Sequence, residues 1–221
     1  MKTQKDAGIK IEAFMRNDQF NFIKAQVTNL VFAHGTSKDK DILEALKSSS
    51  HVKIEALFPD LTANQQAILN TLFDIKEDVQ ARHFLEELRT YVIPFKKVTE
   101  KTATKLFPKI KKLKVTHLEE LDFREISYLG WYDIRLDRKF LIFEINDQLI
   151  GVHGTFRESK KGICSICSKV EEVGLFMAKV KGGRETYTSR GNYICKDSQK
   201  CNQNFTTLAK LHDFVDLVKA Q

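Results

Sequence analysis

The chain has 221 residues, of which 42% are hydrophobic, and its formal net charge at pH 7 is +7. This length allows one large domain or two small ones, and three prolines argue against a disordered linker. The N-terminus is polar and no run approaches the roughly eighteen apolar residues of a membrane span, so we expect neither a signal peptide nor a transmembrane helix. The chain is therefore expected to be cytoplasmic, and its positive charge favours an acidic partner such as a protein face, rRNA or tRNA.

The first part of the chain is predicted to be helical. Apolar residues recur along one face from Phe20 to Val31 at the spacing of an amphipathic helix. A short second helix is expected to begin at Ser37 or Asp39, and a separate apolar cluster closed by Pro59 follows it.

Two further helices complete this region. Thr62 and Gln65 form a capping-box pattern, in which two side chains satisfy free backbone N–H groups at the start of a helix. The last helix must finish near Ile93, because Pro94 disfavours helical backbone at the residue before it. Together these segments predict an antiparallel helical bundle over residues 1–93.

A run of basic residues follows the predicted bundle. Residues 96–114 contain eight lysines and one acidic residue, Glu100. A helical stripe of apolar residues runs from Leu106 to Leu113 beneath the lysines, although Pro108 must start, kink or stop that helix. Two interpretations of this run stay open: a solvated helix face beside a linker, or a basic docking surface for an acidic partner.

After residue 120 the pattern becomes that of strands. Residues 139–145 and 148–153 are rich in strand formers, and Asn146-Asp147 between them predicts a β-hairpin. Trp131, the lone tryptophan, is expected to anchor the core.

Two more strands are expected over residues 173–180 and 187–194, with a turn at 181–183 between them. The final segment, 205–218, has the apolar spacing of a helix. The sequence therefore predicts an α+β protein, in which an α/β domain over residues 94–221 follows the helical bundle.

The four cysteines of the chain all lie toward its C-terminal end, spaced as C-x2-C and C-x5-C: Cys164, Cys167, Cys195 and Cys201. A separation of two residues lets both thiolates of a turn face one tetrahedral zinc ion. A knuckle, then strands, then a second pair leading into a helix is the order of a treble-clef-like zinc finger. Two disulfides or four buried thiols are the alternatives, but nothing in the sequence indicates an oxidising compartment. We expect one structural Zn²⁺ ion held by all four thiolates.

The sequence gives little indication of a catalytic site. Four thiolates close a zinc site and leave no coordination position for water. The motifs H-E-x-x-H, G-x-S-x-G and Walker A are absent, and none of the six histidines forms a ligand-spaced pair. We therefore expect a binding protein and not an enzyme; a zinc-dependent hydrolase is the weakest alternative.

Six short blocks, three of them upstream of the cysteines and three around them, form a recognisable series. They are residues 91–95, 130–131, 138–142, 162–167, 174–177 and 191–198. In this order they resemble the FusB/FusC-type fusidic acid resistance proteins. The cysteine spacing with its flanking residues is the most specific part, whereas the helical first third resembles the family only in pattern and length.

The resemblance implies a helical bundle followed by a zinc-finger domain, and it implies a partner. Family members bind translation elongation factor G through its C-terminal domains and release it from ribosomes on which fusidic acid has trapped it. The drug is neither modified nor exported. The chain is then expected to be a monomer that forms a 1:1 complex with the factor and meets the ribosome only indirectly.

Four residues correspond to the family's recognition surface: Ile163, Arg190, Tyr193 and Phe214. Ile163 stands where the family typically has Phe, which removes aromatic contact area. Tyr193 and Phe214 could instead pack inside the domain. The competing function is a basic zinc-finger protein that binds rRNA or tRNA directly, motivated by the net charge and the lysine run.

Overall fold

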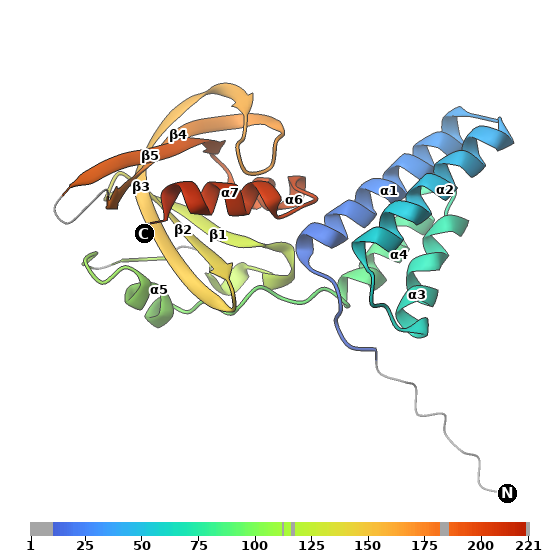
Figure 1. The fold of residues 1–221 in the computed structure, drawn as a ribbon, viewed down its shortest axis with the longest axis horizontal. Coiled ribbons are helices and arrows are strands. Elements are labelled where there is room, and N and C mark those ends of the chain that lie inside the picture. Colours follow the sequence, from blue (N-terminus) through green and yellow to red (C-terminus); the bar gives the residue numbers. More distant parts are fainter. Residues whose placement is uncertain (1–10, 112, 116–117, 182–185, 220–221) are drawn as a thin grey trace, which may run out of the picture. The chain divides into compact units, whose positions relative to one another are not determined.

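A computed structural model describes residues 11–111, 113–115, 118–181 and 186–219 (Figure 1). The chain forms two compact units, each described by itself below. One contains Ile23–Ile93 with the described part of Met1–Met15, and the other contains Pro94–Gln221 with Arg16–Phe22. The polar residues 1–8 and the predicted turn at 182–183 lie outside the described residues.

The N-terminal unit is helical. Its elements are α1 (Asn17–Thr36, from Ile23 onward), α2 (Lys40–Leu57), α3 (Ala63–Asn70), the 3-10 helix η1 (Thr71–Asp74) and α4 (Asp78–Arg89). The buried apolar residues of α1 in this unit are Ile23, Val27, Leu30 and Ala33; the first three were predicted, whereas Val31 is only half-buried and the polar Gln26 is buried as well. The amphipathic pattern of this segment is therefore confirmed.

Helix α2 spans two segments that were predicted to be a short helix and a separate apolar cluster. Asp39 caps its N-terminus by accepting a hydrogen bond from Asp41 N–H at 2.9 Å, as one of the two predicted starts requires. The helix then continues through Ser50, whose hydroxyl lies 3.1 Å from Gln26 Oε1 in the buried interior. No glycine or proline interrupts it before Pro59, which is why one long helix replaces the expected short helix and separate cluster.

The remaining helix boundaries agree with the sequence in part. Thr62 and Gln65 form the predicted capping box of α3. Helix α4 ends at Arg89, earlier than the predicted end near Ile93, because Val92 and Met15 form an isolated parallel bridge. No helix in the described part of the chain is long and apolar enough to cross a membrane.

The C-terminal unit is built on a five-stranded antiparallel sheet in the order β1-β2-β3-β4-β5. The strands are β1 (Tyr128–Asp133), β2 (Arg138–Ile145), β3 (Gln148–Ile163), β4 (Val170–Lys181) and β5 (Tyr187–Cys195). Each strand pairs with the next along the chain, so the sheet is a meander. The predicted α+β architecture, a helical region followed by a sheet domain, is confirmed.

Residues of β2 alternate between two apolar cores because both faces of the sheet are covered. Leu141 and Phe143 belong to the core that also contains the cysteines and the apolar side of α7 (Ala209–Val218). Phe140 and Ile142 belong to the opposite core, together with the buried Trp131. This two-sided burial explains the continuous apolar run of the strand.

Local sequence determines the turn between β2 and β3, the strand that leads to the first cysteine. Asn146 and Asp147 both have positive φ, 50° and 59°, as a two-residue type I′ hairpin turn requires, so the predicted hairpin is confirmed. Strand β3 is far longer than predicted and changes register between Glu158 and Lys161. Beyond this bulge it extends to the residue before the first cysteine.

Short helices surround the sheet (Figure 1). They are α5 (Glu100–Leu106), the 3-10 helices η2 (Leu118–Glu120) and η3 (Phe123–Glu125), α6 (Ser198–Asn204) and α7. Helix α5 ends before Pro108, so the predicted stripe does not continue as a helix through the lysine run. The predicted final helix is preceded by α6, and Phe205 lies between the two helices with its side chain buried.

Candidate functional site: the four-cysteine zinc centre

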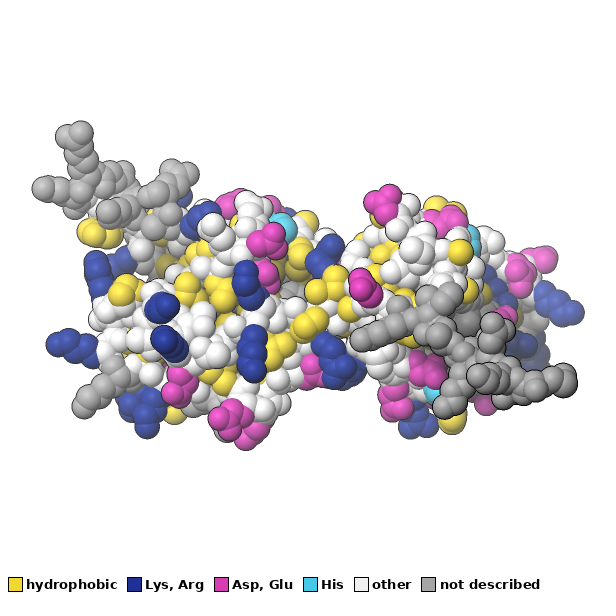
Figure 2. Space-filling view, turned by 90° about the horizontal axis from the view of Figure 1, so that it is seen from below, with side chains coloured by type: hydrophobic (Ala, Val, Ile, Leu, Met, Phe, Trp, Pro, Cys, Tyr) yellow, Lys and Arg dark blue, Asp and Glu magenta, His cyan; other side chains and the backbone are white. Residues whose placement is uncertain are grey.

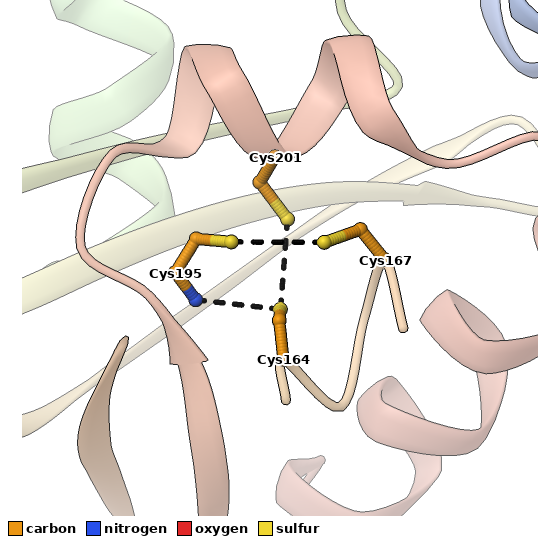
Figure 3. Close-up of side chains that lie close together, drawn as sticks. All are labelled: Cys164, Cys167, Cys195 and Cys201. Carbon is orange, nitrogen blue, oxygen red and sulfur yellow. Dashed lines mark hydrogen bonds between the residues drawn. The ribbon is translucent and has the colours of Figure 1, made fainter. Parts of the chain in front are cut away.

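The zinc ligands come from three places in the C-terminal unit (Figure 3). The turn between β3 and β4 carries two of them, β5 ends on the third, and α6 carries the fourth: Cys164, Cys167, Cys195 and Cys201. All four side chains are buried. A hydrogen bond of 2.8 Å from Ser165 N–H to the Tyr193 carbonyl holds the turn against β5.

The sulfur atoms have the separations of a tetrahedral site. All four lie within 4.8 Å of one another. The Cys164 and Cys201 sulfurs are 3.8 Å apart, and those of Cys167 and Cys195 are 3.7 Å apart. Zn–S bonds of about 2.3 Å in tetrahedral geometry place sulfurs about 3.8 Å from one another. The cysteines are free of disulfides, so the residues fit one Zn²⁺ ion with every position filled by sulfur.

The surroundings of Cys164 favour its ionised form. Its sulfur accepts hydrogen bonds from the N–H groups of Ile166, at 3.4 Å, and Cys195, at 3.3 Å. Thiolates are the form in which cysteine binds zinc, and these two N–H donors stabilise a thiolate at Cys164.

The Tyr128 hydroxyl group is buried beside Cys201 and Ser198. Burial, followed by the charge of Cys201, raises the pKa of Tyr128 well above its ordinary value. The Tyr128 hydroxyl therefore stays protonated and remains a donor. Gly130 lets α6 approach the sheet here, since a Cβ at this position would lie 2.4 Å from Ser198 Oγ.

Asn202 ties the helix of the fourth ligand to the rest of the unit. Its side-chain oxygen accepts from Tyr128 N–H at 3.2 Å, and its side-chain nitrogen donates to the Tyr128 carbonyl at 2.9 Å. Its own carbonyl accepts from the buried amides of Asn17, at 3.2 Å, and Asn21, at 2.7 Å. The first turns of α1 thus belong to the unit that holds the zinc centre.

The four residues of the predicted recognition surface differ in exposure. Ile163 is 69% exposed and Tyr193 is 44% exposed, and Arg190 is exposed as well. Phe214 is only 3% exposed, because its ring packs against Phe176 at 5.9 Å and lies in the core between α7 and the sheet. Three of the four side chains can therefore touch a partner directly, whereas Phe214 packs against β4 in the core.

Strand geometry separates two of the exposed residues. Arg190 and Tyr193 are three positions apart on β5, so their side chains project from opposite faces of the strand. Since β5 is the last strand of the sheet, a partner that meets its outer edge can reach both. These residues surround the edge of β5 and do not form one flat patch.

Sequence reasoning missed two exposed apolar residues beside this surface. Val170 is 67% exposed and lies directly across the β3–β4 pair from Ile163, and Tyr187 is 61% exposed at the start of β5. Val170 falls three residues after the second cysteine, at the position where β4 begins. Recognising that β4 starts there, and not at residue 173, would have identified it.

Comparison with known proteins covers both units. A family model described as the N-terminal part of elongation factor G-binding protein matches residues 14–96. A second, described as the FBP C-terminal treble-clef zinc-finger, matches residues 107–216. The structure of the fusidic acid resistance protein FusC matches with a TM-score of 0.80 and 30% sequence identity, covering 94% of this chain and 98% of that chain. A comparison with curated proteins gives no match.

The chain belongs to the FusB/FusC-type family. The predicted resemblance is thereby confirmed, and so is the treble-clef zinc finger with one structural zinc ion. In this FusB/FusC-type protein the ion joins the β3–β4 turn to β5 and α6. It therefore fixes the backbone on which Ile163 and Tyr193 stand.

Proposed function

We propose that this FusB/FusC-type protein binds translation elongation factor G, through the C-terminal domains of the factor, and frees it from ribosomes stalled by fusidic acid. The observation that carries the proposal is the family match over both units, together with 30% identity to FusC across 94% of the chain. The activity is target protection in the cytoplasm: binding to the factor, without chemistry on the drug.

The exposed apolar residues around β5 support a protein partner. Ile163, Val170, Tyr187 and Tyr193 are large hydrophobic side chains exposed to solvent, and Arg190 adds a cationic donor among them. Aromatic residues and arginine dominate the binding energy of protein interfaces. The zinc centre holds this surface in one conformation before the partner arrives, which lowers the entropic cost of binding.

Release of the factor requires a preference between two of its states. A ligand shifts an equilibrium only by the difference in its affinity for the two conformations. The chain must therefore bind the free factor more tightly than the factor locked on the ribosome by the drug. This preference, and not the absolute affinity, sets how far the equilibrium moves toward free ribosomes.

A binding experiment tests the first half of the proposal. Zinc-loaded chain and elongation factor G are mixed without ribosomes and separated by size-exclusion chromatography with light scattering. We expect a 1:1 complex of the two proteins. Absence of a complex, alongside tight and strongly salt-dependent binding to rRNA or tRNA, would instead support the nucleic-acid function.

A release experiment tests the second half. Ribosomes carrying the factor, GTP and fusidic acid are pelleted with and without the chain. The factor is expected to move from the pellet to the supernatant when the chain is added, and mass spectrometry should recover the drug unchanged. A chain that binds the free factor but leaves the stalled complex intact would contradict the release mechanism alone.

The nucleic-acid alternative depends on the lysine run of residues 96–114 and on the net charge. The Lys96 ammonium donates to the Asp147 carbonyl at 2.6 Å, so one of these cations already serves the fold. On the visible face of the C-terminal unit, Lys and Arg side chains are dispersed among hydrophobic and acidic ones (Figure 2). A protein surface of mixed character fits this distribution better than a phosphate-binding stripe.

A further inference from the structure

Lys139 is a buried cation without a carboxylate partner. It lies near the start of β2 and is 1% exposed. Its ammonium group donates to the Lys196 carbonyl at 2.7 Å and lies 4.8 Å from the centre of the Phe156 ring. Within the described residues no aspartate or glutamate forms an ion pair with it. Burying an unbalanced ammonium group is strongly unfavourable, so an anion must compensate its charge.

The anion that the structure offers is the zinc centre. Four thiolates around one Zn²⁺ ion leave two negative charges in excess. Burial lowers the pKa of Lys139 to about 8, but the charges of Cys201 and Cys195, and after them Asp197 and Cys164, act in the opposite direction. Three of these four neighbouring anions are zinc ligands.

The same lysine holds the backbone between two ligands. Lys196 directly follows Cys195, and the next residue, Asp197, caps α6 by accepting from Gln199 N–H at 2.8 Å. The Lys139 hydrogen bond to the Lys196 carbonyl therefore acts on the short connection between β5 and the helix that carries Cys201. A shift of this connection would move the third and fourth ligands relative to the first pair.

We propose that Lys139 is a positioning residue of the zinc centre: it balances the charge of the four thiolates and fixes the chain between Cys195 and Cys201. Groups outside the ligand set commonly change zinc affinity by about 10- to 100-fold when removed. The inference does not rest on elongation factor G, since it is measured on zinc alone.

The test is Lys139→Met in the full chain, which keeps the length and apolar stem of the side chain and removes its charge. Zinc affinity is measured by competition with a chromophoric chelator, and circular dichroism with zinc present checks the fold. We expect the affinity to fall about 10- to 100-fold. Electrophile-driven zinc release should also be faster, because the thiolates lose their counter-charge.

Two further variants keep the proposal falsifiable. Lys169→Met removes one positive charge from an exposed position two residues after Cys167, and its zinc affinity should stay within about twofold of wild type because water screens exposed charges. Lys139→Arg keeps the charge and should retain most of the affinity for zinc.

The proposal is overturned if folded Lys139→Met binds zinc like wild type or no more weakly than Lys169→Met. If Lys139→Met does not fold, Lys139→Arg decides: tight zinc binding supports the proposal and weak binding overturns it.

Discussion

Tyr193 and Phe214 must affect binding in different ways, because one ring faces solvent and the other lies in the core. Replacing Tyr193 with Ala should cost about 2 kcal/mol of binding free energy, or roughly a 30-fold loss of affinity for elongation factor G. The melting temperature should change little.

Replacing Phe214 with Ala should instead lower the free energy of unfolding by about 3–5 kcal/mol. Calorimetric binding and thermal melting of both variants measure the two effects.

Thr188→Ala serves as the control for Tyr193, since it truncates an exposed residue of the same strand that is not aromatic. Its affinity for the factor should fall far less than that of Tyr193→Ala. Equal losses in the two variants would show that the ring of Tyr193 is not a specific contact. A fully stable Phe214→Ala chain with weak binding would place Phe214 at the interface after all.

At the level of elements, both edges of the sheet carry a residue whose backbone groups are bonded. At the edge of β1, the Asn202 side chain bonds both the N–H and the carbonyl of Tyr128. At the edge of β5, the Tyr193 carbonyl accepts from Ser165 N–H and the Tyr193 N–H donates to the Asn192 side chain, so the stretch before Tyr193 is the part to consider. Tyr193 directs its carbonyl away from β4 to Ser165, so by the alternation of an antiparallel ladder Ser189 and Gly191 also direct their backbone groups outward. An unpaired edge of this kind can accept an extended strand of a partner.

Ser189→Pro removes one outward N–H without breaking the β4–β5 ladder, a position where proline is tolerated in edge strands. If the factor adds a strand to β5, its affinity should fall at least about tenfold, because a backbone hydrogen bond is lost and the ring obstructs pairing. Size-exclusion binding and a thermal melt provide the measurement. Ser189→Ala leaves the backbone intact and should bind like wild type. Wild-type binding by a folded Ser189→Pro chain would exclude strand addition.

The success of sequence reasoning depended on how local the signal was. Asn146-Asp147 specifies its turn through two adjacent residues, and Thr62 with Gln65 specifies a helix start within four residues. The cysteine spacing likewise identified the zinc centre, because metal geometry limits the choices. Phe214 shows the limit: its apolar helix position is compatible with a core or an interface, and only the packing of α7 on the sheet distinguishes the two.

Contacts between residues far apart in the chain could not be predicted from the sequence, for the same reason. Lys139 stands in a strand among apolar residues, and nothing near it in the chain indicates its contact with Lys196, 57 positions away. Asn17 and Asn202 are 185 positions apart and are joined by a single hydrogen bond. Such contacts are set by the fold as a whole, and neither periodicity nor spacing encodes them.

At the level of the whole molecule, a boundary at Ile93 and Pro94 remains our proposal for the two domains, with one addition. Residues Arg16–Phe22 belong to the compact unit of the sheet. The buried amide of Asn21 there donates to the carbonyls of Asn202, at 2.7 Å, and Phe205, at 3.0 Å. A fragment that begins at Pro94 would leave these carbonyls without that donor, so we expect the C-terminal domain to need this stretch of α1 for full stability.

Asn21→Ala in the zinc-loaded full chain tests this dependence. Two buried carbonyls lose a donor, so the free energy of unfolding of the C-terminal unit should fall by about 1–3 kcal/mol. Urea unfolding followed by tryptophan fluorescence reports on this unit alone, because the single tryptophan, Trp131, lies in it. Asn29→Ala, at an exposed position of α1, should leave the transition unchanged. If both variants unfold at the urea concentration of wild type, the start of α1 is dispensable and the domain boundary needs no addition.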